Sequence, residues 1–175
     1  MEEFILTRPT SEYASQIALY RQEFLDAGDS MDGTGALRKT ANPEEYIKLS
    51  IAREDPKNVP EDLVPATQFM FVRKSDSRLL GMLQVRHTFN DYLEKYAGHI
   101  GYSVRPSERR KGYAKEMLRM ALPFCREIGL DKVLITCAKG NIGSEKTILA
   151  NGGVYESTVY EPNGKEYLKR FWIEL

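Results

Sequence analysis

The chain has 175 residues, only two cysteines, and 25 acidic and 25 basic side chains. This length suits a single domain, residues 1–175, that buries a core without disulfides or metal. A net charge of zero argues against nucleic acid as the main partner, because nucleic-acid binding relies on excess positive charge. The sequence has no signal-like N-terminus and no apolar run near the ~20 residues of a membrane span, so we expect a cytoplasmic protein without membrane contact.

Charge and cysteine are distributed in ways that bear on partners. Residues 1–60 carry eleven acids and seven bases, a net of −4, so the remainder carries +4. This division suits a cationic acceptor beside a polyanionic cofactor, although ordinary solvated charge gives the same pattern. Cys125 and Cys137 show no metal-binding spacing, so we expect no metal and two reduced thiols. Cys137 could be acylated, but burial as a small hydrophobe is the favoured interpretation.

Hydrophobic periodicity predicts elements in the order β-α-α-β-β-β-α-β-α-β-β. The expected ranges are strands at 4–6, 67–73, 79–86, 99–104, 132–138, 154–160 and 166–173, and helices at 12–27, from 42, at 111–128 and at 141–150. In the second helix Tyr46, Ile47, Leu49 and Ile51 are expected to be buried, and Pro123 predicts a kink or break in the third. The order predicts an α/β fold: a central mixed sheet with helices on both faces, in which strands 99–104 and 132–138 run parallel.

A basic turn, residues 105–112, lies between strand 99–104 and the following helix. Gly112 removes the Cβ that would block close approach, and the first amides of the helix are free and carry the positive end of its dipole. Arg109, Arg110 and Lys111 add formal charge. The turn therefore predicts a pyrophosphate site, although it matches neither a Walker A loop nor a dinucleotide fingerprint.

The motif Arg109-x-x-Gly112-x-Ala114 resembles the Q/R-x-x-G-x-G/A signature of the GNAT family of N-acetyltransferases. A second stretch, from Cys137 through Asn141 and Ser144 to Asn151-Gly-Gly, resembles the family's strand-turn-helix that closes the cofactor cleft. The element order is also the family's, so the resemblance covers essentially the whole chain. It implies the GNAT-like acyl-CoA N-acyltransferase fold, acetyl-CoA as co-substrate, and direct acetyl transfer to a primary amine of a small molecule or peptide. It also admits a homodimer, since members are often dimers.

The resemblance also assigns residues to the cofactor. The backbone of residues 102–104 would hold the pantetheine arm, and the N–H of Val104 would stabilise the oxyanion formed at the thioester. Asn141 would bond the pantetheine or only cap its helix. The expected cofactor-binding set is Tyr102, Ser103, Val104, Arg109, Arg110, Lys111, Gly112, Tyr113, Ala114, Lys115, Asn141 and Ser144.

The sequence departs from the family at the position of the catalytic acid. Many members carry a tyrosine seven residues after the asparagine to protonate the departing thiolate, and this chain has Ile148 there. A thiol of pKa about 8.5 leaves fairly well unaided, so the missing acid would cost rate, about 10²–10⁴-fold. The hydroxyls of Ser144, Tyr155 and Tyr160 are possible substitutes.

The acceptor amine must lose a proton, which costs roughly 4–5 kcal/mol at pH 7 for a lysine-like pKa unless a base or ordered water takes it. The candidate bases are Glu94, His99 and His87, and for each an ordinary structural or exposed role is the alternative. Carboxylates in and near the loop 28–35 would favour a cationic amine: Glu23, Asp26, Asp29 and Asp32. Two other functions stay open, a non-catalytic acyl-CoA-binding or sensor domain and a module for another nucleotide.

Overall fold

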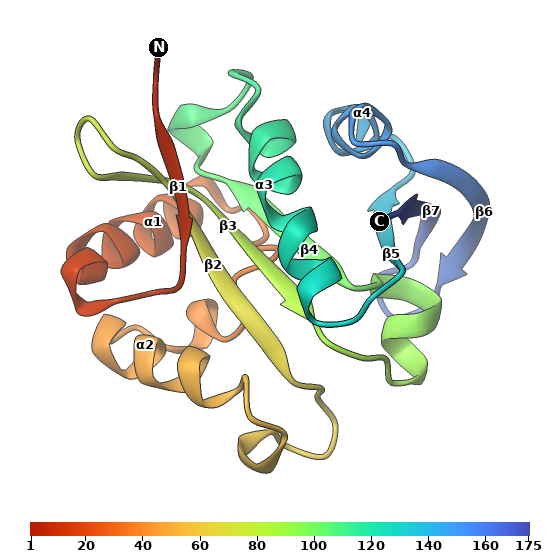
Figure 1. Cartoon of the computed structure of the whole chain (residues 1–175), viewed down its shortest axis with the longest axis horizontal. Coiled ribbons are helices and arrows are strands. Elements are labelled where there is room, and N and C mark those ends of the chain that lie inside the picture. The colour runs from red at the N-terminus through yellow and green to blue at the C-terminus, as the bar shows by residue number, and fades with distance from the viewer.

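The computed structural model describes all 175 residues, and its elements follow the expected order (Figure 1). The strands are β1 (Phe4–Thr7), β2 (Ala66–Arg73), β3 (Arg78–Arg86), β4 (Ile100–Val104), β5 (Lys132–Ala138), β6 (Val154–Glu161) and β7 (Glu166–Glu174). The helices are α1 (Ala14–Ala27), α2 (Pro43–Ala52), α3 (Tyr113–Glu127) and α4 (Ile142–Ala150). Local signals set several of these bounds: Asn42 caps α2 ahead of Pro43, and Gly28 ends α1 with a left-handed backbone.

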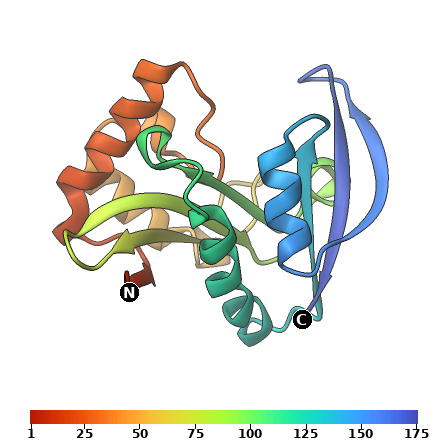
Figure 2. The ribbon, with the colours of Figure 1, turned by 90° about the horizontal axis from the view of Figure 1, so that it is seen from above.

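The strands form two antiparallel sheets, ordered β1-β2-β3-β4 and β5-β7-β6. Helices α1 and α2 cover one face of the first sheet and α3 covers the other, so the sheet lies between two apolar clusters. The second sheet and α4 form the other half of the molecule in Figure 2. The α/β class with helices on both faces is confirmed. The expected mixed sheet with β4 and β5 parallel is not formed, because both sheets are antiparallel and the chain bonds to β5 at one point, just before β4.

That point of contact is a junction at Gly98 and His99, immediately before β4. The N–H of His99 donates to the carbonyl of Leu134 on β5 at 2.8 Å, and the N–H of Leu134 donates to Nδ1 of His99 at 2.9 Å. An imidazole nitrogen thus takes the place that a carbonyl occupies in a β-ladder. Gly98 forms an isolated bridge with Ile135. Beyond this junction no strand pairs with the outer edge of β4.

The junction makes the stability of the fold sensitive to pH. His99 is 5% exposed, and its burial together with repulsion from Arg86 lowers its pKa from 6.5 to about 4. The unfolded chain therefore takes up a proton at this side chain as the pH falls below 6.5, whereas the folded chain resists until about pH 4. This contribution to stability is complete above pH 6.5 and is lost as the pH falls toward 4.

We expect wild-type protein to lose about 2 kcal/mol of unfolding free energy through His99 between pH 6.5 and pH 5. Urea unfolding at both pH values measures this loss, and His99→Gln, which does not titrate there, should lose about 2 kcal/mol less. Equal losses in the two proteins would show that His99 is not held neutral by the junction.

Two local expectations differ from the structure. Ile51 is 44% exposed rather than buried, because it lies in the last turn of α2, while Tyr46 and Ile47 make the core contacts. Helix α3 is not broken at Pro123 but continues to Glu127. Pro123 is exposed, so the carbonyl one turn back that it leaves without an N–H can be solvated by water.

Candidate active site

The turn from β4 into α3 presents a run of unpaired main-chain amides. None of the N–H groups of residues 109–112 donates a hydrogen bond within the chain, and the first-turn amides of α3 have no intrahelical acceptor. Gly112 precedes α3 with a φ of +82°, and a Cβ built there would meet nothing within 4 Å. The turn therefore has the free donors, the open approach and the helix dipole that a bound phosphate requires.

Of the three consecutive basic side chains at residues 109–111, two are engaged by the protein itself. Arg109 folds back, donating to the carbonyl of Val104 at 3.1 Å and to Asp29 at 2.7 Å. Lys111 donates to Glu108 at 2.8 Å. Arg110 is exposed, has a φ of +64° and makes no side-chain hydrogen bond. Because those two charges are partly neutralised, main-chain amides are the principal donors at this site.

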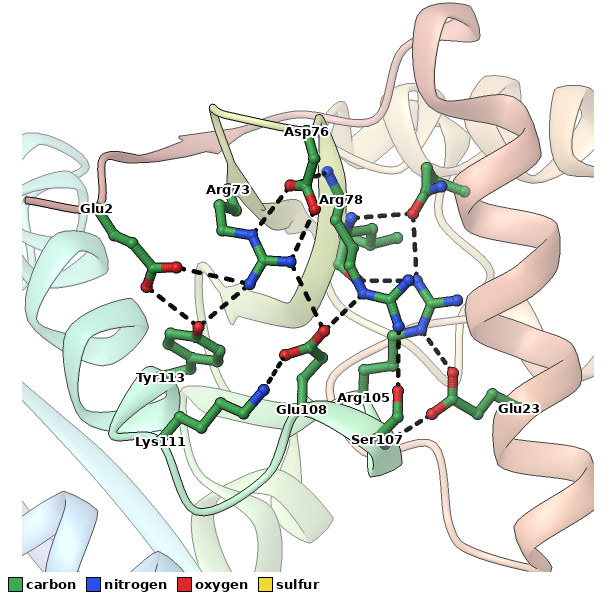
Figure 3. Close-up of polar contacts among 12 residues, drawn as sticks. Glu2, Glu23, Arg73, Asp76, Arg78, Arg105, Ser107, Glu108, Lys111 and Tyr113 are labelled. Atoms are coloured by element: carbon green, nitrogen blue, oxygen red, sulfur yellow. Dashed lines mark hydrogen bonds and ion pairs between the residues drawn. The ribbon is translucent and has the colours of Figure 1, made fainter.

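Two carboxylates, the buried Glu108 and the partly buried Glu23, hold the turn in place (Figure 3). Glu108 accepts hydrogen bonds from Arg78 at 2.6 Å and from Lys111. Glu23 of α1 accepts from Arg105 at 2.6 Å and from the N–H of Ser107 at 2.7 Å. Burial alone would raise the pKa of Glu108, but the hydrogen bonds from Lys111 and Arg78 outweigh it and lower the pKa. These contacts tie the turn to α1 and to the β2–β3 hairpin, so it is fixed without a ligand.

The expected cofactor residues at the start of α3 differ in whether their side chains or only their main chains are free to contact a ligand. The ring of Tyr113 is buried against β1 and β2, and its hydroxyl contacts Arg73 and Glu2, so only its main chain faces the turn. Ala114 is partly buried, whereas Lys115 is exposed and its carbonyl accepts a hydrogen bond from Asn151 of the segment after α4. In this stretch, therefore, the groups that can contact a cofactor are the first-turn amides of α3 and the charged side chain of Lys115.

The outer edge of β4 offers a second set of free main-chain groups. The ladder with β3 is bonded at both ends, from the N–H of Arg86 to the carbonyl of His99 and from the N–H of Arg105 to Leu80. Because antiparallel bonding alternates, Tyr102 and Val104 direct their N–H groups away from β3. Ser103 does the opposite: its backbone pairs with β3, and its hydroxyl lies 2.9 Å from that of Tyr20 on α1. Ser103 is thus directed away from the edge.

Across the crevice between β4 and α4, two hydroxyls meet. The hydroxyl of Tyr102 lies 2.7 Å from Oγ of Ser144, and burial raises the pKa of this tyrosine, which keeps it protonated. Asn141 caps α4 by accepting the N–H of Ser144 at 3.1 Å, as its alternative interpretation proposed. Ile148 is fully buried in the core. Sequence reasoning assigned only the backbone of Tyr102 and missed its hydroxyl.

The structure does not bring the other catalytic candidates to this crevice. Nδ1 of His99 is occupied by the Leu134 N–H, so it is not available as a base. Glu94 is exposed in the turn Leu93–Ala97 and lines a wide depression of about 460 Å³ with residues of β6 and β7. Tyr160 lies on β6, separated from β5 by β7, and packs on Tyr167. His87, immediately after β3, bonds Thr67 on the β2 side of the sheet.

The remaining chemistry of the chain is limited. Burial raises the pKa of Cys125 to about 12 and of Cys137 to about 11, so both thiols stay protonated and Cys137 is a poor nucleophile. No group of three or more His, Cys, Asp or Glu side chains is arranged to hold a metal ion. No helix has the length and apolar character needed to cross a bilayer.

Comparison with known proteins identifies the family. The model for the acetyltransferase (GNAT) domain matches residues 5–154, whereas no curated protein sequence matches significantly. Ribosomal-protein-S5-alanine acetyltransferase from Vibrio fischeri is similar in structure, with a TM-score of 0.73, 18% identity and coverage of 99% of this chain and 94% of that one. The microcin C7 self-immunity acetyltransferase MccE, in complex with acetyl-CoA and AMP, has a TM-score of 0.72 and 16% identity, and the match covers 99% of this chain and 93% of that one. RimL, in complex with coenzyme A, has a TM-score of 0.70 and 13% identity, and the match covers 98% of this chain and 94% of that one. The chain therefore belongs to the GNAT family and is an acetyl-CoA-dependent N-acetyltransferase.

Proposed function

We propose that this single-domain enzyme transfers the acetyl group by direct attack of a primary amine on the thioester, in the crevice between β4 and α4. The observation that supports this most is that free main-chain donors lie at the edge of β4 and again, after residues 105–108, in the turn at residues 109–112. The diphosphate would bind the turn, the pantetheine amides would bond the edge at Tyr102 and Val104, and the N–H of Val104 would face the developing oxyanion.

We assign the proton that the thiolate receives to the hydroxyl pair of Tyr102 and Ser144. The pair lies at the crevice, and the hydroxyl of Tyr102 carries its proton at neutral pH. Such a donor replaces the family's tyrosine, whose position holds the buried Ile148. This removes the main argument for a non-catalytic sensor. The acceptor's proton passes to water, because neither His99 nor Glu94 reaches the crevice.

Tyr102→Phe is expected to lower kcat about 100-fold, the low end of general acid catalysis, with little change in acetyl-CoA affinity. Ser144→Ala should have a smaller effect of the same kind. Tyr20→Phe is a matched control, since it also removes a buried hydroxyl bonded to a serine of this region, Ser103, but on the other face of β4. An unchanged kcat in Tyr102→Phe would remove the proposed acid.

Calorimetry with acetyl-CoA, ATP and NAD tests the cofactor, and thiol release tests turnover. We expect binding of acetyl-CoA only, and acceleration of thiol release by at least one class of amine. The neighbours' names indicate how wide the acceptor panel must be: they include enzymes named for alanine of a ribosomal protein and for spermidine. Binding of acetyl-CoA without any acceptor that accelerates release above hydrolysis would contradict the proposed function.

A further inference from the structure

The face of the first sheet beneath α1 and α2 changes from apolar to polar along its strands. Met70 on β2 and Met82 on β3 are fully buried in the cluster under the two helices. Two residues further toward the other end, on the same face, lie Gln68 and Gln84, followed by Arg86 on β3. Burying polar groups costs free energy unless they are hydrogen-bonded, so the partners of these side chains need to be identified.

These polar groups are incompletely bonded within the chain. Gln68 is 3% exposed, and its amide nitrogen donates to the carbonyl of Gly33 at 2.7 Å, but its Oε1 has no partner. The side chain of Gln84 forms no hydrogen bond within the chain, and it lines a small cavity with Gln68 and Gly35. Buried polar atoms in folded proteins are normally paired, so Oε1 of Gln68 is available to a water or to a polar group of a ligand.

Arg86 is the charged member of this group and has no counter-ion. Its Nη1 donates to the carbonyls of Ala97 and Gly98 at 3.3 and 3.2 Å, and no carboxylate lies within ion-pair distance. Burial lowers its pKa, with Asp32 and Tyr92 opposing the change. The other partly buried arginines of the site region, Arg78 and Arg105, are paired with Glu108 and Glu23. Arg86 therefore has no carboxylate in direct contact with its guanidinium.

The guanidinium lies beside the first residues of β4, where the crevice begins. A Cβ at Gly101 would be 3.1 Å from Nη2 of Arg86 and 3.3 Å from the N of Gly33, so the absence of a side chain makes room for the arginine between β4 and the loop after α1. Gly101 immediately precedes Tyr102, whose N–H faces the crevice. A ligand on Arg86 would thus lie next to the β4 edge.

The carboxylates expected to favour a purely cationic acceptor are mostly engaged. Glu23 pairs with Arg105, Asp29 with Arg109, and Asp26 accepts from Gln22. Asp26 and Asp32 have no cationic partner, and of these two Asp32, which accepts from Ser30, faces Arg86. One free acid beside one free guanidinium matches a molecule that carries both an ammonium and an anionic group.

We propose that the acceptor is an amino-acid-like amine whose carboxylate binds the guanidinium of Arg86, with Gln84 as a further polar contact. This inference rests on the proposed acetyl transfer and adds the class of acceptor. A guanidinium–carboxylate pair is charge-assisted and can be bidentate, so removing either partner should lower kcat/KM about 10- to 100-fold.

The test measures thiol release from acetyl-CoA with amines in three matched forms: free amino acids, their carboxamides and their decarboxylated amines, over several side-chain classes. At least one free acid should exceed its amide by 10-fold or more in kcat/KM. Arg86→Met should reduce that ratio to near one while acetyl-CoA affinity is unchanged. Arg21→Met is the matched control, because Arg21 also donates only to two backbone carbonyls, those of Leu37 and Arg38, and its ratio should stay at the wild-type value.

Carboxamides or decarboxylated amines that react as fast as the acids would overturn this inference and leave acetyl transfer intact. An acid-to-amide ratio of kcat/KM that stays at the wild-type value in Arg86→Met would also overturn the inference and leave acetyl transfer intact. Bound acetyl-CoA with no reactive amine of any form would overturn the proposed function together with the inference. If Arg86→Met does not fold, wild-type inhibition decides: 3-phenylpropionate should compete with the acceptor and its amide should not, and equal inhibition contradicts the role of the carboxylate.

Discussion

Gly112→Trp is expected to weaken acetyl-CoA binding at least about 100-fold, because several charge-assisted hydrogen bonds from the turn would be lost together. The Cβ of residue 112 points into open space at the N-terminus of α3, where the phosphates are proposed to lie. An indole there would fill the approach to the amides of residues 109–112. Calorimetric titration with acetyl-CoA measures the loss, and circular dichroism checks the fold.

The control for this variant lies at the other end of the same helix. Gly129 also has a left-handed backbone, with a φ of +92°, and a Cβ there would also meet nothing within 4 Å. Gly129→Trp therefore carries the same kind of backbone strain, about 1–2 kcal/mol, without touching the turn. It should bind acetyl-CoA like the wild type. Similar affinities in the two variants would show that the turn does not hold the cofactor.

Gly98→Ala is expected to destabilise the fold by about 3 kcal/mol or more, through left-handed strain and overpacking. Gly98 has a φ of +70°, and a Cβ there would lie 2.3 Å from the carbonyl oxygen of Leu134. Relieving that clash requires the two sheets to separate at the junction that His99 holds together. Urea unfolding measures the stability, and kcat should also fall because the crevice on the far side of the junction changes shape.

Gly140→Ala is the control that separates the strain of a left-handed backbone from the steric clash with Leu134. Gly140 has a φ of +98° after β5, but a Cβ there would meet nothing within 4 Å. It should cost only about 1–2 kcal/mol, the penalty of the left-handed backbone. If both variants lose the same stability, the contact between Gly98 and Leu134 does not control how the sheets meet.

The sequence predicted what depends on neighbouring residues. Strands and helices follow from local periodicity, and the turn before α3 follows from Gly112 and the helix start. The structure added what depends on distant partners. His99 was a candidate base in the sequence analysis. Its contact with Leu134 spans 35 residues, so nothing in the neighbouring sequence shows that Nδ1 is already occupied. The hydroxyl of Tyr102 gained its role only when α4 placed Ser144 beside it, 42 residues later.

Charged residues of the site show the same limit. Counting charges near the loop 28–35 predicted a cationic acceptor, but two of the four carboxylates are paired with remote arginines. Asp29 binds Arg109, 80 residues away, and Glu23 binds Arg105. The guanidinium of Arg86 also lacks an ion pair, and sequence reasoning did not single it out. Its signal in the sequence was slight: a polar pair, Gln84 and Arg86, at the end of an otherwise apolar strand.

A crystal structure of the protein with coenzyme A tests the central claim most directly. We predict that diphosphate oxygens lie about 2.7–3.2 Å from main-chain nitrogens of residues 109–112, the range of ordinary N–H···O bonds, with the pantetheine along the edge of β4. A diphosphate bound elsewhere, with these four nitrogens still lacking acceptors, would contradict the account.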